Sequence, residues 1–183
     1  MNVRKIAIIA TFVALCVATN YALVGVPNVK VMDFIVFIGG FCFGPFTGAL
    51  IGVLSWAVYG AINPYGFVFQ VWVATMFSET IYGILGGLLG KNLTSTNFGD
   101  ERLKLSIFFG TMGFIMTLIY DLVTNVVFAL AVDWPIIVAL IFGIPFAILH
   151  EVSNAAIFSV GSIPVIAVLE KVSGGNRFGI SKK

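Results

Sequence analysis

Long apolar runs leave this chain very few ways to fold. Five runs of 21 to 34 residues make up most of its length, and together they contain only four charged side chains. A helix that crosses the hydrocarbon core of a bilayer needs about 20 mostly apolar residues. Only 10% of the residues are charged, against about 25% in soluble domains, so a water-soluble fold could not cover these runs. The sequence therefore predicts an all-α integral membrane protein, which crosses the cell membrane several times and contacts lipid.

The second apolar run, residues 31–61, is longer than one helix needs. The pair Gly44-Pro45 stands near its middle. Proline lacks an N–H and pushes the residue before it away from helical geometry, so this pair favours a turn. We therefore expect two helices here, at about 32–43 and 46–62. One kinked helix, with an odd number of spans, is the alternative.

The positions of the basic residues favour six spans over five. They fall in four places: Arg4 and Lys5, Lys30, the stretch 91–104, and the tail after residue 170. Cytoplasmic segments are enriched in lysine and arginine. With six spans, nine of the ten basic residues share the side of the N-terminus, so both termini are predicted to be cytoplasmic.

The last run contains Pro145 and Pro164. A split there would put the basic tail outside, so we expect one long, kinked helix instead. The whole chain, 1–183, is then expected to form a single transmembrane domain. Its predicted helices are 6–26, 32–43, 46–62, 67–90, 105–132 and 136–169.

Small residues recur every four positions in three ladders along the first four of these helices. Helices approach closely in lipid where small residues line the contact. Such ladders fit internal packing, and the alanine ladder also fits docking of another membrane protein. The ladders are Ala10, Ala14 and Ala18; Gly40, Gly44, Gly48 and Gly52; and Gly83 with Gly87.

Ionisable side chains inside a membrane are costly and therefore point to function. Here they are Glu79, Asp121, His150 and Glu151. At 1.5 Å per residue, the first three lie roughly 16–22 Å from the outer ends of their helices, which is one layer near mid-membrane. Polar partners stand three or four residues away on the same faces: Tyr82, Asn125 and Asn154.

Aromatic residues nearer the outer surface complete a predicted pocket that opens outward, with aromatic walls and a polar floor. These are Trp56, Tyr59, Tyr65, Trp72 and Trp134. The alternative is that the polar groups only satisfy one another, for example Asp121 with His150. Trp72 and Trp134 also fit an interfacial aromatic belt. Lys30 and Asp33 are interpreted as ordinary interfacial charges at the outer edge.

Motifs of soluble function are incomplete or missing. The segment His150-Glu151-Val152-Ser153-Asn154 begins like a zinc-protease motif, but it lacks the second histidine. His150 is the only histidine, so a zinc site with two histidine ligands from one chain is excluded. There is no Walker A loop and no dinucleotide fingerprint. Cys16 and Cys42 lie in apolar runs and are interpreted as small hydrophobes. We expect no enzymatic activity, no cofactor, no bound metal and no nucleic-acid partner.

Taken in order, these motifs resemble the S components of energy-coupling factor (ECF) vitamin transporters. The resemblance covers nearly the whole chain. It rests on a basic start followed by the alanine ladder, the Gly-Pro turn in residues 40–48, Leu54-Ser55-Trp56, and the glycine-rich stretch 82–88.

The resemblance implies an S-component bundle that binds a vitamin or related micronutrient from outside. It also implies a transmembrane T component and two cytoplasmic ATPases as partners, with Ala10, Ala14 and Ala18 contacting the T component. Substrate would lie between the first loop and the outer halves of the fourth, fifth and sixth helices. The substrate-binding residues expected on this basis are Trp72, Glu79, Tyr82, Asp121, Asn125, His150, Glu151 and Asn154.

Two other functions stay open at this point. One is a stand-alone secondary transporter or channel that uses Glu79, Asp121 and His150 as a proton or cation relay. The other is a membrane enzyme, which has only the incomplete zinc motif to support it. Cobalt- and nickel-type S components carry a histidine near the N-terminus where this chain has Asn2, so a metal-ion substrate is not expected.

Overall fold

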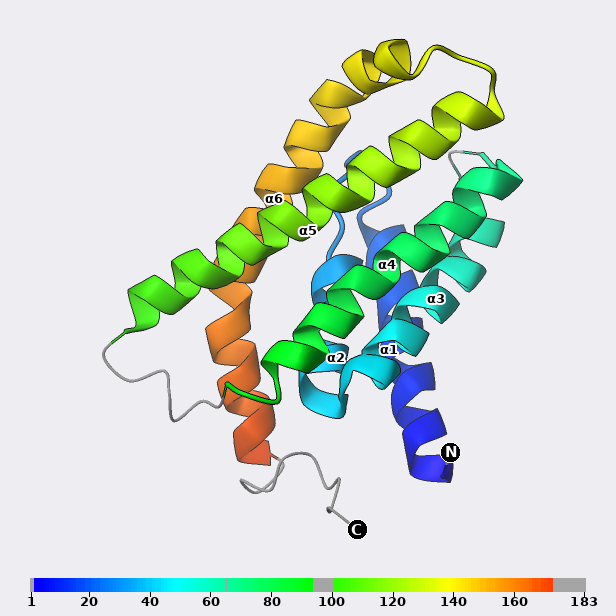
Figure 1. Cartoon of the computed structure of the whole chain (residues 1–183). Coiled ribbons are helices and arrows are strands. Elements are labelled where there is room, and N and C mark those ends of the chain that lie inside the picture. Colours follow the sequence, from blue (N-terminus) through cyan, green and yellow to red (C-terminus); the bar gives the residue numbers. More distant parts are fainter. Residues whose placement is uncertain (1, 65, 94–100, 173–183) are drawn as a thin grey trace.

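The computed structural model describes residues 2–64, 66–93 and 101–172, and every regular element in these ranges is a helix. The all-helical class predicted from the apolar runs is therefore confirmed. The helices cross one another as a bundle (Figure 1). Their bounds are α1 Val3–Ala22, α2 Met32–Phe43, α3 Pro45–Ala61, α4 Phe69–Leu89, α5 Arg102–Ala131 and α6 Ile136–Val172.

The two ends of the bundle differ in chemistry. The loops that follow α1, α3 and α5 lie together at the upper end in Figure 1, which we call the pocket end. The start of α1, the turn between α2 and α3, and the end of α6 lie at the opposite end, which we call the basic end. The start of α1, the end of α4, the start of α5 and the end of α6 contain six basic residues of the described ranges: Arg4, Lys5, Lys91, Arg102, Lys104 and Lys171.

Within the described ranges, four helices are long and apolar enough to cross a membrane, namely α1, α4, α5 and α6. The other two are shorter, with 12 residues in α2 and 17 in α3. All eleven residues from Met32 to Cys42 are buried. The short helix α2 is therefore the centre of the bundle, and the longer helices surround it.

The break between α2 and α3 lies at Gly44, where the Gly44-Pro45 pair predicted a turn. Gly44 has φ 92° and ψ 162°, a conformation that favours glycine because it has no Cβ. Its N–H donates to the Gly40 carbonyl and closes α2. Pro45 then opens α3 at the first helical position, where a missing N–H costs nothing.

The helices extend differently from the apolar runs. The helix α1 begins at Val3 because the Asn2 side chain accepts a hydrogen bond from the Lys5 N–H at 3.0 Å. It ends at Ala22, four residues before the predicted end, because the chain turns there into the loop 23–31. The helix α6 continues through Pro145 and Pro164 to Val172, so the last run forms one helix, as expected, and ends three residues beyond the predicted bound of 169.

Glycines let α2, α3 and α4 meet backbone to backbone. A Cβ placed on Gly40, Gly48 or Gly83 would overlap main-chain atoms of another of these three glycines. Each of these positions therefore requires glycine on steric grounds. The internal-packing interpretation of the glycine ladders is confirmed for these positions.

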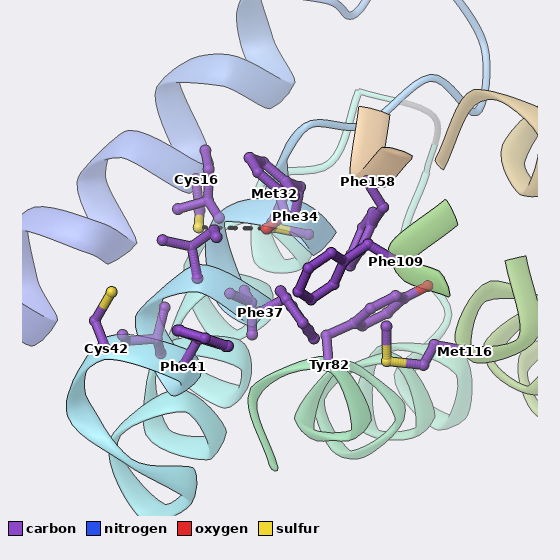
Figure 2. Packing of buried hydrophobic residues seen from close by; sticks show 14 of the residues in the cluster. Cys16, Met32, Phe34, Phe37, Phe41, Cys42, Tyr82, Phe109, Met116 and Phe158 are labelled. Carbon is purple, nitrogen blue, oxygen red and sulfur yellow. Dashed lines mark hydrogen bonds between the residues drawn. The ribbon is translucent and has the colours of Figure 1, made fainter. Parts of the chain in front are cut away.

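Aromatic side chains fill the centre of the bundle (Figure 2). The Phe37 ring lies 5.1 Å from Phe158 and 6.1 Å from Phe109, measured between ring centroids. Phe34 packs edge-on against Phe158 at 5.3 Å. These contacts join α2 to α5 and α6, so the core holds the elements that carry the polar residues described next.

Candidate functional site

A cavity of about 500 Å³ opens at the pocket end of the bundle. Residues from α1, α3, α4, α5 and α6 line it, together with the loop 23–31. Its polar or charged lining side chains are Asn20, Asn28, Lys30, Asn63, Thr75, Asp121, Thr124 and Asn125, and its aromatic ones are Trp56, Tyr59, Tyr120, Phe128 and Phe146.

The loop 23–31 forms one wall of the cavity, and hydrogen bonds fix its position relative to the helices. Asn28 has a left-handed backbone (φ 55°), and its side-chain N–H donates to the Phe146 carbonyl of α6 at 3.1 Å. On the other side, the Tyr21 hydroxyl donates to the Ile62 carbonyl at 2.8 Å. These bonds join elements that are far apart in the chain, so the loop has a defined position over the pocket.

A cation lies on two aromatic rings in the cavity. The Lys30 ammonium is 5.1 Å from the Trp56 ring centroid and 5.3 Å from that of Tyr120, within the range of cation–π attraction. Trp56 is 5% exposed. The interpretation of Lys30 as an ordinary interfacial charge was therefore wrong, because the loop turns its side chain inward over these rings.

The floor of the cavity is a chain of buried hydrogen bonds. Asp121, which lines the cavity, lies 3.0 Å from His150 Nδ1 through its Oδ1. His150 Nε2 lies 2.7 Å from Asp33 Oδ2. Both ring nitrogens of His150 therefore lie within hydrogen-bond distance of a carboxyl oxygen, and the ring bridges the two acidic side chains.

Asp33 was interpreted as an interfacial charge, and this was also wrong. Its side chain is 1% exposed, because α2 starts inside the bundle and not at its surface. A start at the membrane edge was the natural expectation for a chain of transmembrane helices, and only the packing of α2 in the centre removes it.

The hydrogen-bonded chain continues below the cavity. The Asn154 side-chain N–H groups donate to Asp33 Oδ2 at 2.6 Å and to Thr117 Oγ1 at 2.8 Å. The Tyr82 hydroxyl donates to the same threonine oxygen at 2.9 Å. One network therefore joins α2, α4, α5 and α6 beneath the pocket.

Glu79 lies beneath the pocket wall and is fully buried. The Trp56 indole N–H donates to Glu79 Oε2 at 3.0 Å. The carboxyl group of Glu79 thus supports an aromatic wall of the cavity from behind, and it does not line the cavity itself.

The predicted site residues divide into three groups. Asp121 and Asn125 line the cavity. Four others are fully buried and lie behind it, namely Glu79, Tyr82, His150 and Asn154. Glu151 is 8% exposed and Trp72 is partly buried, and neither lines this cavity.

Trp72 lines a second, smaller cavity of about 260 Å³ beside the first. Its indole N–H donates to the Trp56 carbonyl at 3.0 Å. Trp134 is 48% exposed and packs against Phe128 and Phe142, so it is no part of the main cavity. Tyr65 lies outside the described residues.

Several lining residues were not predicted as site residues. Asn28, Lys30 and Asn63 lie in breaks between apolar runs, namely in the loop and the turn that were expected to close over the substrate, but none was singled out as a binding residue. Asn20 lies in the last turn of α1 and is 4% exposed. In the sequence, the one signal for this residue was a polar side chain near the end of an apolar run.

Residues 1–171 match the family model of the ECF-type riboflavin transporter, S component. The chain belongs to this family. The resemblance drawn from the sequence motifs is therefore confirmed, and the chain is a multi-pass membrane protein of vitamin uptake from a family of transporter subunits. The comparisons with curated proteins and with solved structures returned no significant match.

Proposed function

We propose that this S component captures a riboflavin-type vitamin in the 500 Å³ cavity and delivers it to an ECF transporter. The observation that carries the proposal is the lining of that cavity, which combines aromatic rings with amide side chains. A flat, fused-ring vitamin needs both kinds of group, because its faces stack and its ring edge hydrogen-bonds.

The aromatic pair Trp56 and Tyr120 is the proposed stacking surface. Their ring centroids lie 6.4 Å apart and their planes differ by 31°. The Lys30 ammonium occupies the faces of both rings. A vitamin ring that stacks there displaces the ammonium, which can then move to the polar edge of the ligand.

The amide and carboxylate groups are the proposed readers of the ligand's polar atoms. Asn20, Asn28, Asn63 and Asn125 line the cavity, and each side-chain amide can donate and accept. Asp121 accepts only, so it suits a hydroxyl group of the ligand. The other predicted site residues are proposed to act through these groups from behind.

The proposed topology has six spans, with the pocket end outside and both termini in the cytoplasm. The accumulation of basic residues at the opposite end supports this orientation. The helix α2, with 12 residues, is about 18 Å long, shorter than the hydrocarbon core of about 30 Å. We propose that the loop 23–31 spans the rest of the membrane on the pocket side of α2, because Lys30 and Asp33 already lie inside the bundle.

The proposed partners are a transmembrane T component and two ATPases. Ala10, Ala14 and Ala18 are exposed on α1, while Ile9, Cys16 and Asn20 of the same helix are buried. The alanines therefore form a smooth outer strip to which a helix of the T component can pack closely.

Riboflavin titration of the purified protein tests the ligand. Flavin fluorescence is quenched when the ring stacks on tryptophan or tyrosine, so we expect saturable quenching with one site per chain. Trp56→Leu should weaken it strongly. Trp134→Leu is the matched control, because Trp134 lies outside the cavity and is 48% exposed. Equal loss in both variants, or no saturable quenching in the natural protein, would contradict the proposal.

A stand-alone transporter is distinguished by flux. Liposomes that contain this chain alone should show no riboflavin accumulation, while addition of a T component and both ATPases with ATP should produce it. Accumulation by the chain alone, driven by an ion gradient, would favour the secondary transporter instead.

A further inference from the structure

A third cavity lies between α5 and α6, away from the proposed vitamin site. Its volume is about 400 Å³, and it shares no lining residue with the main cavity. Two of its lining residues come from α5, namely Arg102 and Ser106, and five come from α6, namely Ser159, Val160, Ile163, Pro164 and Ala167. The proposed function gives this cavity no role.

The crossing of α5 and α6 creates this cavity. A Cβ placed on Gly110 would lie 3.0 Å from the Ala155 carbonyl oxygen and 3.0 Å from the Ser159 Cβ, so the two helices touch there. Beyond this contact, the start of α5 and the end of α6 separate (Figure 1). The cavity fills the space between the separating ends, because its α5 residues all precede Gly110 and its α6 residues begin at Ser159.

The level of the crossing brings the cavity close to the lipid headgroups. The distance along α5 from Gly110 to its last residue, Ala131, is roughly 32 Å at 1.5 Å per residue. The distance along α6 from its first residue, Ile136, to Ser159 is roughly 35 Å. The hydrocarbon core is about 30 Å thick. With the pocket end outside, as proposed above, the cavity therefore lies at the cytoplasmic edge of the core.

Arg102 gives this cavity a cation that is free to bind an anion. In the part of the chain that the structure describes, no carboxylate lies within ion-pair distance of its guanidinium. The nearby Lys104 differs, because its ammonium is paired with Glu101 at 2.7 Å. A guanidinium group can bind a phosphate through two parallel hydrogen bonds.

Uncharged polar groups of the same cavity also lack partners. Ser106 stands one turn after Arg102 on the same face of α5. Neither its hydroxyl nor that of Ser159 has a hydrogen-bond partner among the described residues. Pro164 has no N–H, so the Val160 carbonyl one turn earlier loses its helical donor. Such groups are costly in apolar surroundings, and a ligand with both donors and acceptors would satisfy them.

We propose that this cavity binds the headgroup of an anionic phospholipid from the cytoplasmic leaflet. Arg102 binds the phosphate, and the hydroxyls of Ser106 and Ser159 donate to its oxygens. A hydroxyl of the headgroup donates to the Val160 carbonyl. The apolar residues of α6 in the lining contact the apolar part of the lipid. Basic pockets between helices on the cytoplasmic side are suited to such headgroups.

Lipid retention by the purified protein tests this proposal without riboflavin, so its outcome is independent of the vitamin. The protein in mild detergent is titrated with phosphatidylglycerol, or with phosphatidylcholine of the same acyl chains, and bound lipid is counted by native mass spectrometry. We expect one phosphatidylglycerol to be retained per chain, and phosphatidylcholine to be retained far less. Equal retention of the two lipids, or retention of neither, would overturn the proposal.

Two variants with the same loss of charge separate a site from general attraction to basic residues. Arg102→Gln should weaken phosphatidylglycerol binding by about tenfold or more, because it removes charge-assisted bonds to the phosphate. Lys104→Gln is the matched control and should change binding little, because its side chain is 77% exposed and already paired. Equal losses in both variants would overturn the proposal. The double variant Ser106→Ala with Ser159→Ala keeps all charges and should also weaken binding.

Two other occupants are distinguished by further measurements. Displacement of the lipid by millimolar inorganic phosphate would indicate a soluble phosphate ligand and would overturn the assignment to a lipid. In the assembled transporter, a photoreactive amino acid at position 160 should attach to phospholipid. Attachment to the T component instead would place a protein partner in the cavity and would also overturn the proposal.

Discussion

Replacing His150 with leucine removes the one side chain that joins two buried carboxylates. The histidine is fully buried, and its ring nitrogens lie 3.0 Å from Asp121 Oδ1 and 2.7 Å from Asp33 Oδ2. In His150→Leu both carboxyl groups lose this hydrogen-bond partner, and leucine offers no polar atom in its place. The variant should therefore be less stable and should lose the order of the pocket floor.

The magnitude follows from the two bonds. Hydrogen bonds to charged groups contribute about 1.5–3 kcal/mol each in soluble proteins, while interhelical hydrogen bonds in membranes average about 0.6 kcal/mol. Two bonds then bracket the loss between about 1 and 6 kcal/mol. Because both carboxyl groups stay buried without this partner, we expect about 3 kcal/mol, near the cost of breaking a buried ion pair.

The assay is the free energy of unfolding, measured by titrating the purified protein from mild detergent into a denaturing one. Ser153→Ala is the matched control, because its hydroxyl donates only to the His150 carbonyl of its own helix, at 3.0 Å. A loss in His150→Leu within about 0.5 kcal/mol of the control, the usual effect of a neutral substitution, would refute the argument that this histidine holds the floor together.

Three further predictions address packing, docking and binding. Gly83→Ala should lower the free energy of unfolding by about 1–3 kcal/mol through overpacking. The control is Gly25→Ala, whose added Cβ meets nothing within 4 Å and which should leave the free energy of unfolding unchanged. An equal or higher unfolding midpoint for Gly83→Ala would contradict the backbone contact. Ala14→Leu should abolish uptake by the assembled transporter while riboflavin quenching stays unchanged, and normal uptake would reject the docking role of the alanine strip. Asp121→Ala should weaken riboflavin binding by about tenfold or more. The control is Thr124→Ala, which also lines the cavity but whose hydroxyl donates to its own helix at 2.9 Å. Unchanged riboflavin affinity in Asp121→Ala would limit Asp121 to a structural role.

Local rules were enough to predict the helices and the main break between them. Apolar length alone predicts an all-helical membrane protein, because an unsatisfied backbone is too costly in lipid for most other structures. The Gly44-Pro45 pair predicts the turn between α2 and α3, since both effects of proline act on neighbouring residues. The glycine ladders likewise predict close helix contacts, because backbone approach requires a missing side chain.

The polar residues of the site could be identified in the sequence because such residues are energetically costly inside a membrane. Their hydrogen-bond partners could not be identified in this way. Glu79, Asp121 and His150 stand out in any apolar run, and Asp121 and Asn125 do line the cavity. The pairing of Asp121 with His150 was one of two open interpretations. It became definite only when α5 and α6 were placed side by side.

The class of the protein, its helices, its family motifs and the identity of its costly buried groups can be predicted from the sequence, because each depends on residues close together in the chain. The packing of the helices is needed to place α2 in the centre of the bundle, to turn Lys30 inward onto Trp56, and to bring Asp33 to His150 and Asn154, more than a hundred positions away. A residue two positions from a loop looks like a surface charge in sequence. It becomes the buried partner of a histidine only because longer helices surround the short one that carries it.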